Sequence, residues 1–172
     1  VQTCALPIYH PGPLLALGPS ASESIASIRS LALPRLIHLT RTLAKASYLG
    51  MLVGSYCRFI VSIESPSIAL SANRDGVVIP AHECAAGIAM LSHLPQSSVA
   101  KLYSEERQER VDTRGPNIDD VEWQLQHVRE RGIALIAEPG TPAVTGIGVA
   151  IASQESDIRL GLSVALPTSR YE

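Results

Sequence analysis

Aromatic residues are scarce in this sequence: one Trp, five Tyr and one Phe make up 4% of 172 residues. So few rings leave little material for the base-stacking platforms of proteins that bind single-stranded nucleic acid. Positive charge is not in excess either, because 14 Lys and Arg stand against 16 Asp and Glu, a formal net charge of -2. Such a chain has no general attraction to phosphate backbones, so we do not expect these residues to hold DNA by themselves.

Cysteines and long apolar runs are also few. Cys4, Cys57 and Cys84 have no paired spacing and no CxxC motif, which argues against a disulfide framework and against a zinc knuckle. A reducing cytoplasm is therefore the expected setting. The longest apolar run, residues 132–153, is interrupted by a glutamate, a glycine and two prolines, and it lacks the ~18 uninterrupted apolar residues of a membrane span. We expect neither a membrane partner nor a signal peptide.

The beginning of the chain does not read as folded protein. Residues 1–8, VQTCALPI, resemble the translation of a common sequencing adapter, with an ordinary flexible tail as the alternative, and we leave them out of the fold argument. Residues 9–20 hold three prolines and two glycines, which is typical of an interdomain connector. The remaining 21–172 are expected to form one domain, because 46% hydrophobic content supplies one substantial core.

The first half of this domain predicts one helix followed by strands. Apolar residues within 25–43 recur every three or four positions, the pattern of an amphipathic helix. Pro34 is expected to kink this helix or to divide it in two. Residues 48–64 are rich in Val, Ile, Tyr and Phe, which predicts two adjacent strands with a tight connection. Further short strands are predicted at 68–70 and 76–79.

Two helices are predicted next. The first covers 84–94 and is stopped by Pro95. Ser97 or Ser98 is expected to cap the second. The inward side chains of this second helix should be those of Val99, Leu102 and Tyr103.

The best-specified element is a helix over 117–131. Asn117 is a suitable N-cap, acids fill the first turn, arginines fill the last, and Gly132 supplies a left-handed stop. The buried stripe should consist of Val121, Leu125 and Val128. Two strands follow at 145–152 and 159–166. This order of elements predicts an α+β fold with an antiparallel sheet.

Candidate reactive groups are few. His82, Glu83 and Cys84 could ligate a metal, but adjacent residues do not share one helix face and no second cluster completes the coordination. A capping or core role for His82 is therefore preferred to zinc. Ser163 lacks a Gly-x-Ser-x-Gly elbow, so its hydroxyl is expected to bond to a ligand or to backbone. With no nucleophile, base and orienter to assemble, we expect no enzyme.

The start of the predicted helix at 84–94 carries only small side chains, Cys84-Ala85-Ala86-Gly87. Small residues at a helix N-terminus leave backbone N–H groups open to a carboxylate, because the first turn has no intrahelical acceptors. They also allow a helix to pack closely on a sheet. The residues alone leave both interpretations open.

Three segments carry a resemblance to a known family: 161–170 (GLSVALPTSR), 74–82 (RDGVVIPAH) and 84–89 (CAAGIA). Together they resemble the effector-binding domain of the IclR-type (isocitrate lyase regulator) transcriptional regulators, over residues 9–172. The resemblance implies a GAF-like fold, an antiparallel sheet with helices packed on its faces and an effector pocket on one side. Family members bind DNA through a preceding winged helix-turn-helix domain and usually continue into a final helix. The chain is therefore expected to be truncated at both ends.

The resemblance also implies a binding site. Its ligand-binding positions correspond to Ile79, Ala85, Ala86, Ile136, Val149, Ser163 and Ala165. In members that sense small hydroxy or keto acids several of these positions are polar, whereas here only Ser163 keeps its hydroxyl. An unpaired buried polar group costs ~1–3 kcal/mol, so the expected effector is a partly apolar small organic acid. Its carboxylate is expected at the backbone of Ala85 and Ala86, with no catalytic, metal or cofactor site.

The implied function is ligand sensing by a homo-oligomeric regulator. The effector would control operator binding through the winged helix-turn-helix domain that this sequence lacks. The alternative is a free-standing GAF-like sensory domain of a signalling protein, which would share the sheet but not the preceding DNA-binding domain.

Overall fold

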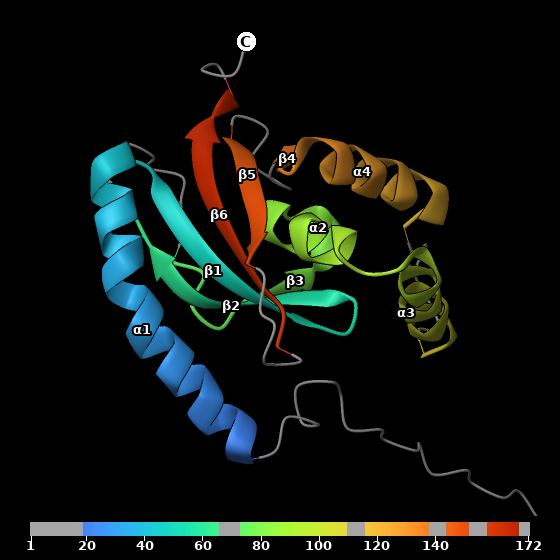
Figure 1. Ribbon diagram of the computed structural model, residues 1–172, viewed down its shortest axis with the longest axis horizontal. Coiled ribbons are helices and arrows are strands. Elements are labelled where there is room, and N and C mark those ends of the chain that lie inside the picture. Colours follow the sequence, from blue (N-terminus) through green and yellow to red (C-terminus); the bar gives the residue numbers. More distant parts are fainter. Residues whose placement is uncertain (1–18, 66–72, 110–115, 138–143, 152–157, 169–172) are drawn as a thin grey trace, which may run out of the picture.

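The chain folds around one sheet that carries helices on both faces (Figure 1). The computed structural model describes residues 19–65, 73–109, 116–137, 144–151 and 158–168. The predicted α+β class with an antiparallel sheet is confirmed.

The sheet has six strands: β1 (Ala46–Val53), β2 (Tyr56–Ile63), β3 (Val78–Pro80), β4 (Ala134–Ala137), β5 (Val144–Ile151) and β6 (Leu160–Pro167). Their order is β3-β2-β1-β6-β5-β4, and every neighbouring pair is antiparallel. The predicted β1–β2 pair and the two strands near the C-terminus are confirmed, and the predicted strand at 76–79 begins at Val78. The candidate strand at 68–70 lies outside the described residues.

Helix α1 (Pro19–Leu43) runs along one face of the sheet (Figure 1). The predicted apolar face is confirmed over most of the helix, because Leu36 is buried and Ile25, Ile28 and Ala32 pack against the same core. Its last expected member, Leu43, is exposed. The division into two helices at Pro34 is wrong: the helix continues through the proline. Burial of its apolar face outweighs the hydrogen bond that the missing N–H of proline removes.

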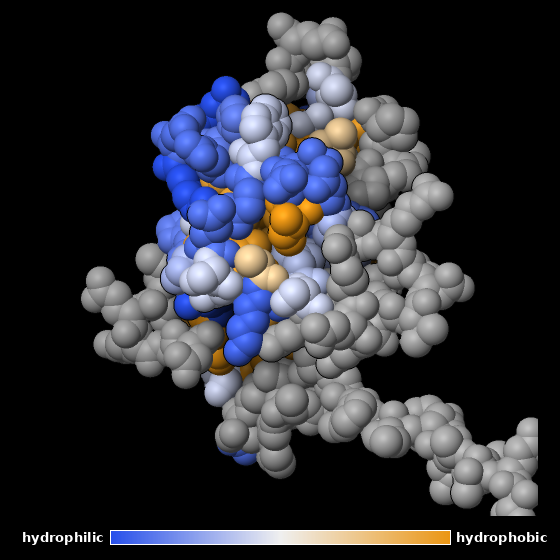
Figure 2. All heavy atoms as spheres, turned by 90° about the vertical axis from the view of Figure 1, so that its right-hand side faces the viewer, coloured by the Kyte–Doolittle hydropathy of each residue, from blue (hydrophilic) through white to orange (hydrophobic). Residues whose placement is uncertain are grey.

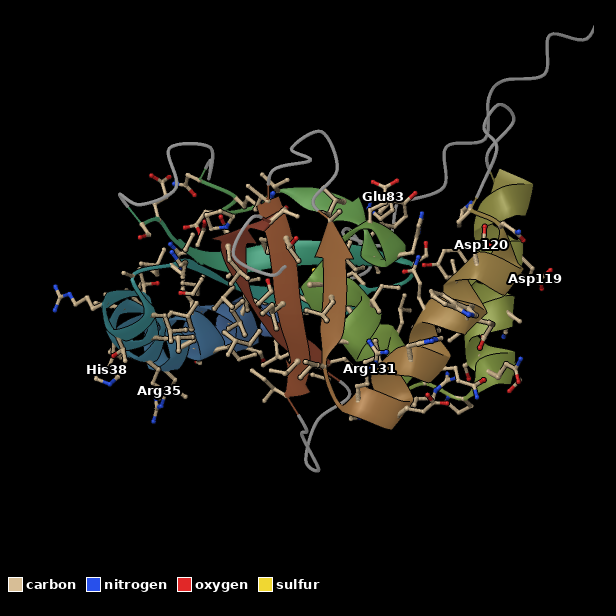
Figure 3. The ribbon with its side chains drawn as sticks, turned by 90° about the horizontal axis from the view of Figure 1, so that it is seen from above. Arg35, His38, Glu83, Asp119, Asp120 and Arg131 are labelled. Carbon is tan, nitrogen blue, oxygen red and sulfur yellow. The ribbon has the colours of Figure 1, made fainter. Side chains whose placement is uncertain are left out.

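The other face of the sheet is covered by η1 (Ala81–Glu83), α2 (Ala85–Ser92), α3 (Gln96–Glu109) and α4 (Ile118–Arg131). Figure 3 shows α1 on one side of the sheet and α2 and α4 on the other. Helix α2 lies against the sheet, with α4 packed on it. Each face therefore has its own apolar core, and every buried residue of α2 is enclosed between layers.

The ends of α3 and α4 test the capping predictions. Helix α3 begins at Gln96, so Ser97 and Ser98 lie inside its first turn and the predicted serine cap is wrong. The N–H groups of Ser98 and Val99 donate instead to the carbonyl of Pro95. The inward residues of α3 are confirmed: Val99 and Tyr103 are buried and Leu102 packs against the core.

Helix α4 ends as predicted. The Asn117 side chain accepts a hydrogen bond from the N–H of Asp119 at 3.2 Å, and Gly132 closes the helix with φ 76° and an N–H bond to Val128. Asp119 and Asp120 lie at one end of the helix and Arg131 at the other, where they complement the helix dipole (Figure 3).

Candidate functional site

The face of β6 that bears Ser163 is fixed by strand alternation. Leu160 and Leu162 pack in the core under α1, and successive side chains of a strand point to opposite faces. Gly161, Ser163 and Ala165 therefore face α2. Ser163 is 6% exposed, and the described part of the structure gives its hydroxyl no hydrogen-bond partner.

Cross-strand pairing extends this face over the neighbouring strands. On β5, Gly148 lies opposite Ser163 and Gly146 opposite Ala165. On β1, Tyr48 lies opposite Ser163. Directly paired residues share a face, so the α2 side of the sheet around Ser163 is built mainly of glycine, alanine and the ring of Tyr48.

The first turn of α2 presses on this glycine-rich surface. A Cβ atom added at Gly148 would overlap the carbonyl of Ala85, and one added at Gly161 would lie 2.6 Å from the carbonyl oxygen of Ala86. Ala85 and Ala86 are 1% and 0% exposed. The small residues therefore serve close packing of the helix on the sheet, and this packing brings both alanines next to Ser163 and Ala165.

Ile136 joins this group, whereas Ile79 does not. Ile136 on β4 pairs with Gly146, which pairs with Ala165, so the three lie in one row across the sheet. Ile79 is on the opposite edge strand, where it pairs with Cys57 two rows away from Ser163. It packs against the same core, but the structure does not bring it to the serine.

Val149 faces the other side of the sheet. Its cross-strand partner is Leu162, which packs in the core under α1. Gly148 and Ala150 are the β5 residues that face α2, so the expected pocket position is one residue out of register. A slip of one residue exchanges the two faces of a strand, so Val149 lies on the face opposite to that of Ser163.

His82, Glu83 and Cys84 do not converge. The Nδ1 atom of His82 lies 3.2 Å from the Tyr103 hydroxyl, with the two rings 5.6 Å apart, so this histidine ties η1 to α3. Cys84 is buried and points its thiol to the carbonyl of Ala81, while the Glu83 side chain is partly exposed. No group of three or more potential metal ligands occurs within the described residues.

One charged residue over this face was missed by sequence reasoning. The guanidinium carbon of Arg74 lies 5.2 Å from the ring centre of Tyr48 and 5.5 Å from that of Phe59. The two rings meet edge to face at 5.7 Å. Arg74 stands in an Asp-Gly turn, a pattern that predicts the turn but gives no sign of where the side chain lies.

A hollow lies beside α4. Its volume is about 160 Å³, and it is lined by Ile88 and Ile136 below and by Trp123, His127 and Arg131 toward the rim. Trp123 is 65% exposed, and its ring centre lies 4.0 Å from that of His127 with the two ring planes tilted by 44°. Figure 2 shows this side of the molecule as mostly hydrophilic, with a few apolar residues exposed between polar ones.

The family model for the C-terminal part of the bacterial transcriptional regulator IclR matches residues 21–172. The chain belongs to this family. It is 27% identical over 146 residues to the HTH-type transcriptional regulator XynR of Escherichia coli, an alignment that covers 84% of this chain and 58% of the relative. The IclR-type chain thus spans less than two thirds of the curated relative that it matches.

Solved structures share the IclR fold. Thermotoga maritima IclR aligns with a TM-score of 0.73 and 18% identity, over 91% of this chain and 65% of that one. The repressor BlcR of Agrobacterium tumefaciens aligns with a TM-score of 0.67 and 20% identity, over 89% of this chain and 63% of the BlcR chain. An IclR homologue from Microbacterium hydrocarbonoxydans was solved with 4-hydroxybenzoate. It aligns with a TM-score of 0.68 and 18% identity, over 83% of this chain and 59% of the homologue.

Family membership decides between the two kinds of protein that the sequence suggested, a domain of an IclR-type regulator and a free-standing sensory domain. The chain is an effector-binding domain of the IclR type, and a free-standing GAF-like sensory domain of another signalling family is not favoured. Within the described residues, no helix is both long and apolar enough to cross a membrane.

Proposed function

We propose that this domain is the ligand-sensing half of a DNA-binding regulator. A small organic acid would bind on the α2 face of the sheet and control operator binding by a winged helix-turn-helix domain outside these residues. Two relatives support the proposal: the E. coli relative is named as an HTH-type regulator, and the M. hydrocarbonoxydans homologue was solved with 4-hydroxybenzoate.

The observation that carries the proposal is the Ser163 hydroxyl. It is nearly buried, faces the first turn of α2 and has no hydrogen-bond partner in the described part of the structure. A ligand oxygen or N–H that pairs with this hydroxyl would gain the net free energy of one hydrogen bond, about 0.5–1.5 kcal/mol. The binding residues in this proposal are Ala85, Ala86, Ile136, Ser163 and Ala165.

The chemistry of this surface selects the ligand. Beside Ser163 the α2 face carries Gly146, Ala165 and Ile136, none of which has a polar side chain. A ligand with several hydroxyl or keto groups would lose hydration there without compensation. The effector in our proposal is therefore an aromatic or medium-chain acid with one polar end.

Our proposal assigns no catalysis to this domain. Ser163 is the one hydroxyl in the proposed binding set, and a nucleophilic serine needs a base within hydrogen-bond reach. The described histidines stand on α1, on η1, after α2 and on α4, and none is on the sheet. A cytoplasmic, self-associating regulator whose copies meet through such domains completes the proposal.

The test uses a matched pair of strand serines. Ser163 faces α2, whereas Ser47 on β1 is buried on the α1 side, where its hydroxyl lies 2.6 Å from that of Thr40. Calorimetric titration of the chain with aromatic and aliphatic acids should show that Ser163→Ala weakens binding by about 1–2 kcal/mol, roughly 5- to 30-fold. Ser47→Ala should lower stability and leave affinity unchanged. Equal affinity in wild type and Ser163→Ala would place the ligand elsewhere.

A further inference from the structure

A larger hollow, of about 360 Å³, lies between α3 and the end of the β1–β2 hairpin. One wall consists of Leu52 and Gly54 of the hairpin and of Arg159, which directly precedes β6. The other wall is formed by Leu94 and by one face of α3. Small-molecule sites typically have volumes of about 300–1,000 Å³, so this hollow is large enough to hold a small ligand. The residues proposed above to bind the effector lie outside its lining.

Backbone structure fixes both walls. The N–H of Leu52 donates to the carbonyl of Arg159 at 2.9 Å, which holds the start of β6 beside the end of β1. On the opposite wall, Ser98, Lys101 and Leu102 line the hollow, and their spacing of three and four residues places them on one face of α3. Side chains from three separate elements therefore meet around one space.

The floor of this hollow is apolar. Leu52, Leu94 and Leu102 are half-buried, and all three pack against the core on the α2 side of the sheet. Their remaining exposed surface faces a space that a ligand can fill, and apolar groups that contact it leave water. The floor therefore suits an alkyl chain.

The polar groups around the floor are hydrogen-bond donors. The charged side chains that line the hollow are two cations, Lys101 on α3 and Arg159 on the opposite wall, and no acid stands among the described residues of the lining. The Ser98 hydroxyl adds a donor beside Lys101. Two positive charges at one hollow stand out in a chain whose formal net charge is -2, and they attract an anion.

Arg159 is the residue that we assign to direct contact. Its side chain is exposed, and the described part of the structure gives the guanidinium no hydrogen bond and no ion pair. Its planar fork can donate two parallel bonds to a carboxylate. Lys101 already has an interaction of its own, and its charge adds to the positive potential without having to touch the ligand.

Helix α3 is the part of the fold that a ligand in this hollow would hold. Among the described helices and strands, α3 makes its main contact with α4 and few contacts with the sheet. Figure 1 shows α3 at the margin of the molecule, on the side toward which the β1–β2 hairpin points. Elements with few packing contacts open most readily. A ligand that touches both walls would therefore join α3 to the sheet.

We infer that this hollow is a second ligand site, which binds a single-chain amphiphile with an anionic head group, such as a medium-chain carboxylate. The alkyl chain lies on the three leucines, and the carboxylate bonds to Arg159. Bound there, the ligand fixes α3 against the β1–β2 hairpin. The inference goes beyond the proposed function, because it uses none of the residues of the proposed effector site.

The experiment uses three ligands that share one alkyl chain. The 172-residue chain is titrated calorimetrically with octanoate, 1-octanol and octylammonium, which carry a negative, a neutral and a positive head. Arg159→Met keeps an unbranched stem and removes the charge. Arg35→Met removes the charge of an exposed arginine on α1, on the other side of the sheet (Figure 3). Ser163→Ala reports on the proposed effector site, and circular dichroism checks that each variant is folded.

Octanoate should bind most tightly and octylammonium least. Arg159→Met should weaken octanoate binding about 3- to 10-fold, a modest factor because water partly screens an exposed charge pair, and leave octanol affinity within twofold. Arg35→Met should match wild type. Hydrogen exchange followed by mass spectrometry should show that octanoate protects residues 52–54 and 94–102, in wild type and in Ser163→Ala alike.

The inference and the proposed function fail separately. If octanoate does not bind, if octanol binds as tightly, or if Arg159→Met binds octanoate as wild type does, the second site is refuted. A loss of octanoate binding in Ser163→Ala alone would place this acid at the proposed effector site and also refute the second site. If Arg159→Met weakens octanoate binding while Ser163→Ala affects no acid, the second site stands and the proposed effector site falls.

Discussion

Replacing Gly148 by alanine should separate α2 from the sheet. An added Cβ would overlap the carbonyl group of Ala85, a backbone group in the first turn of the helix. Backbone atoms cannot rotate aside as the end of a side chain can, so either α2 or β5 has to shift. The positive-φ glycines of the described chain are Gly54, Gly76 and Gly132, so Gly148 has a conformation open to alanine and the whole cost comes from the close approach.

The expected loss of stability can be compared with that at two neighbouring glycines, Gly161 and Gly50. Overpacking typically lowers the free energy of unfolding by about 1–3 kcal/mol. A Gly→Ala change raises it by about 0.4–1 kcal/mol, because alanine reduces the conformational entropy of the unfolded chain. We expect Gly148→Ala to lose about 2 kcal/mol. Gly161→Ala should lose about 1 kcal/mol, because its nearest atoms are the Ala86 carbonyl oxygen at 2.6 Å and the movable Met90 side chain. Gly50→Ala should be close to neutral, since it meets the Cys57 sulfur, which can turn away.

Urea unfolding followed by circular dichroism measures this series. A loss of about 2 kcal/mol in a chain of this size also lowers the melting temperature by about 4–8 °C. Gly148→Ala should in addition weaken acid binding, because Ala85 and Ala86 are displaced from Ser163. Equal unfolding midpoints for the three variants, or a larger loss at Gly50 than at Gly148, would refute the close-packing argument.

Two further predictions concern α4 and the register of β5. Asn117→Ala should lower the free energy of unfolding in urea by about 1 kcal/mol, because the helix loses its N-cap. Asn117→Asp keeps a capping oxygen and should stay near wild type. Equal losses in the two variants would exclude capping as the cause. Val149→Ala should leave acid affinity within twofold because Val149 faces α1. Ala165→Val, which adds volume beside Ser163, should reduce that affinity, and the opposite pattern in calorimetry would show that the β5 register is misassigned.

The sequence predicted best the helix whose two ends are fixed by capping residues next to it in the chain. Asn117 and Gly132 satisfy the ends of α4 within one turn, so the sequence alone located that helix to within a residue. The start of α3 was missed because the turn at Pro95 ends α2 and begins α3 at once, which leaves no place for a serine cap before Gln96. Local preference could not decide between a continuous and a divided α1, because the outcome at Pro34 depends on burial against β1 and β2.

Some positions around Ser163 could be predicted from the sequence and others could not. Strand alternation decides which face a strand residue is on, whereas the place of a turn side chain depends on the tertiary fold. Ser163 and Ala165 share the α2 face, as their spacing of two implies, because β6 pairs with both neighbours without a register shift. Val149 was expected on this face, but the pairing of β5 with β6 places it opposite Leu162 on the α1 side. Arg74 could not be found by pattern, since a turn residue reaches the sheet only through the fold of the turn.

Close packing explains why no charged side chain stands on this part of the sheet. The helix approaches the sheet so nearly that Gly148 and Gly161 have no room for a Cβ, and residues beside them are confined to alanine and serine. A charged side chain on these strands would have to be buried under α2, at a cost of several kcal/mol without a partner. Arg74 stands at the margin, in the turn before β3, with its guanidinium over the rings of Tyr48 and Phe59. The same packing that makes the surface around Ser163 apolar therefore keeps this charge at the edge of the face.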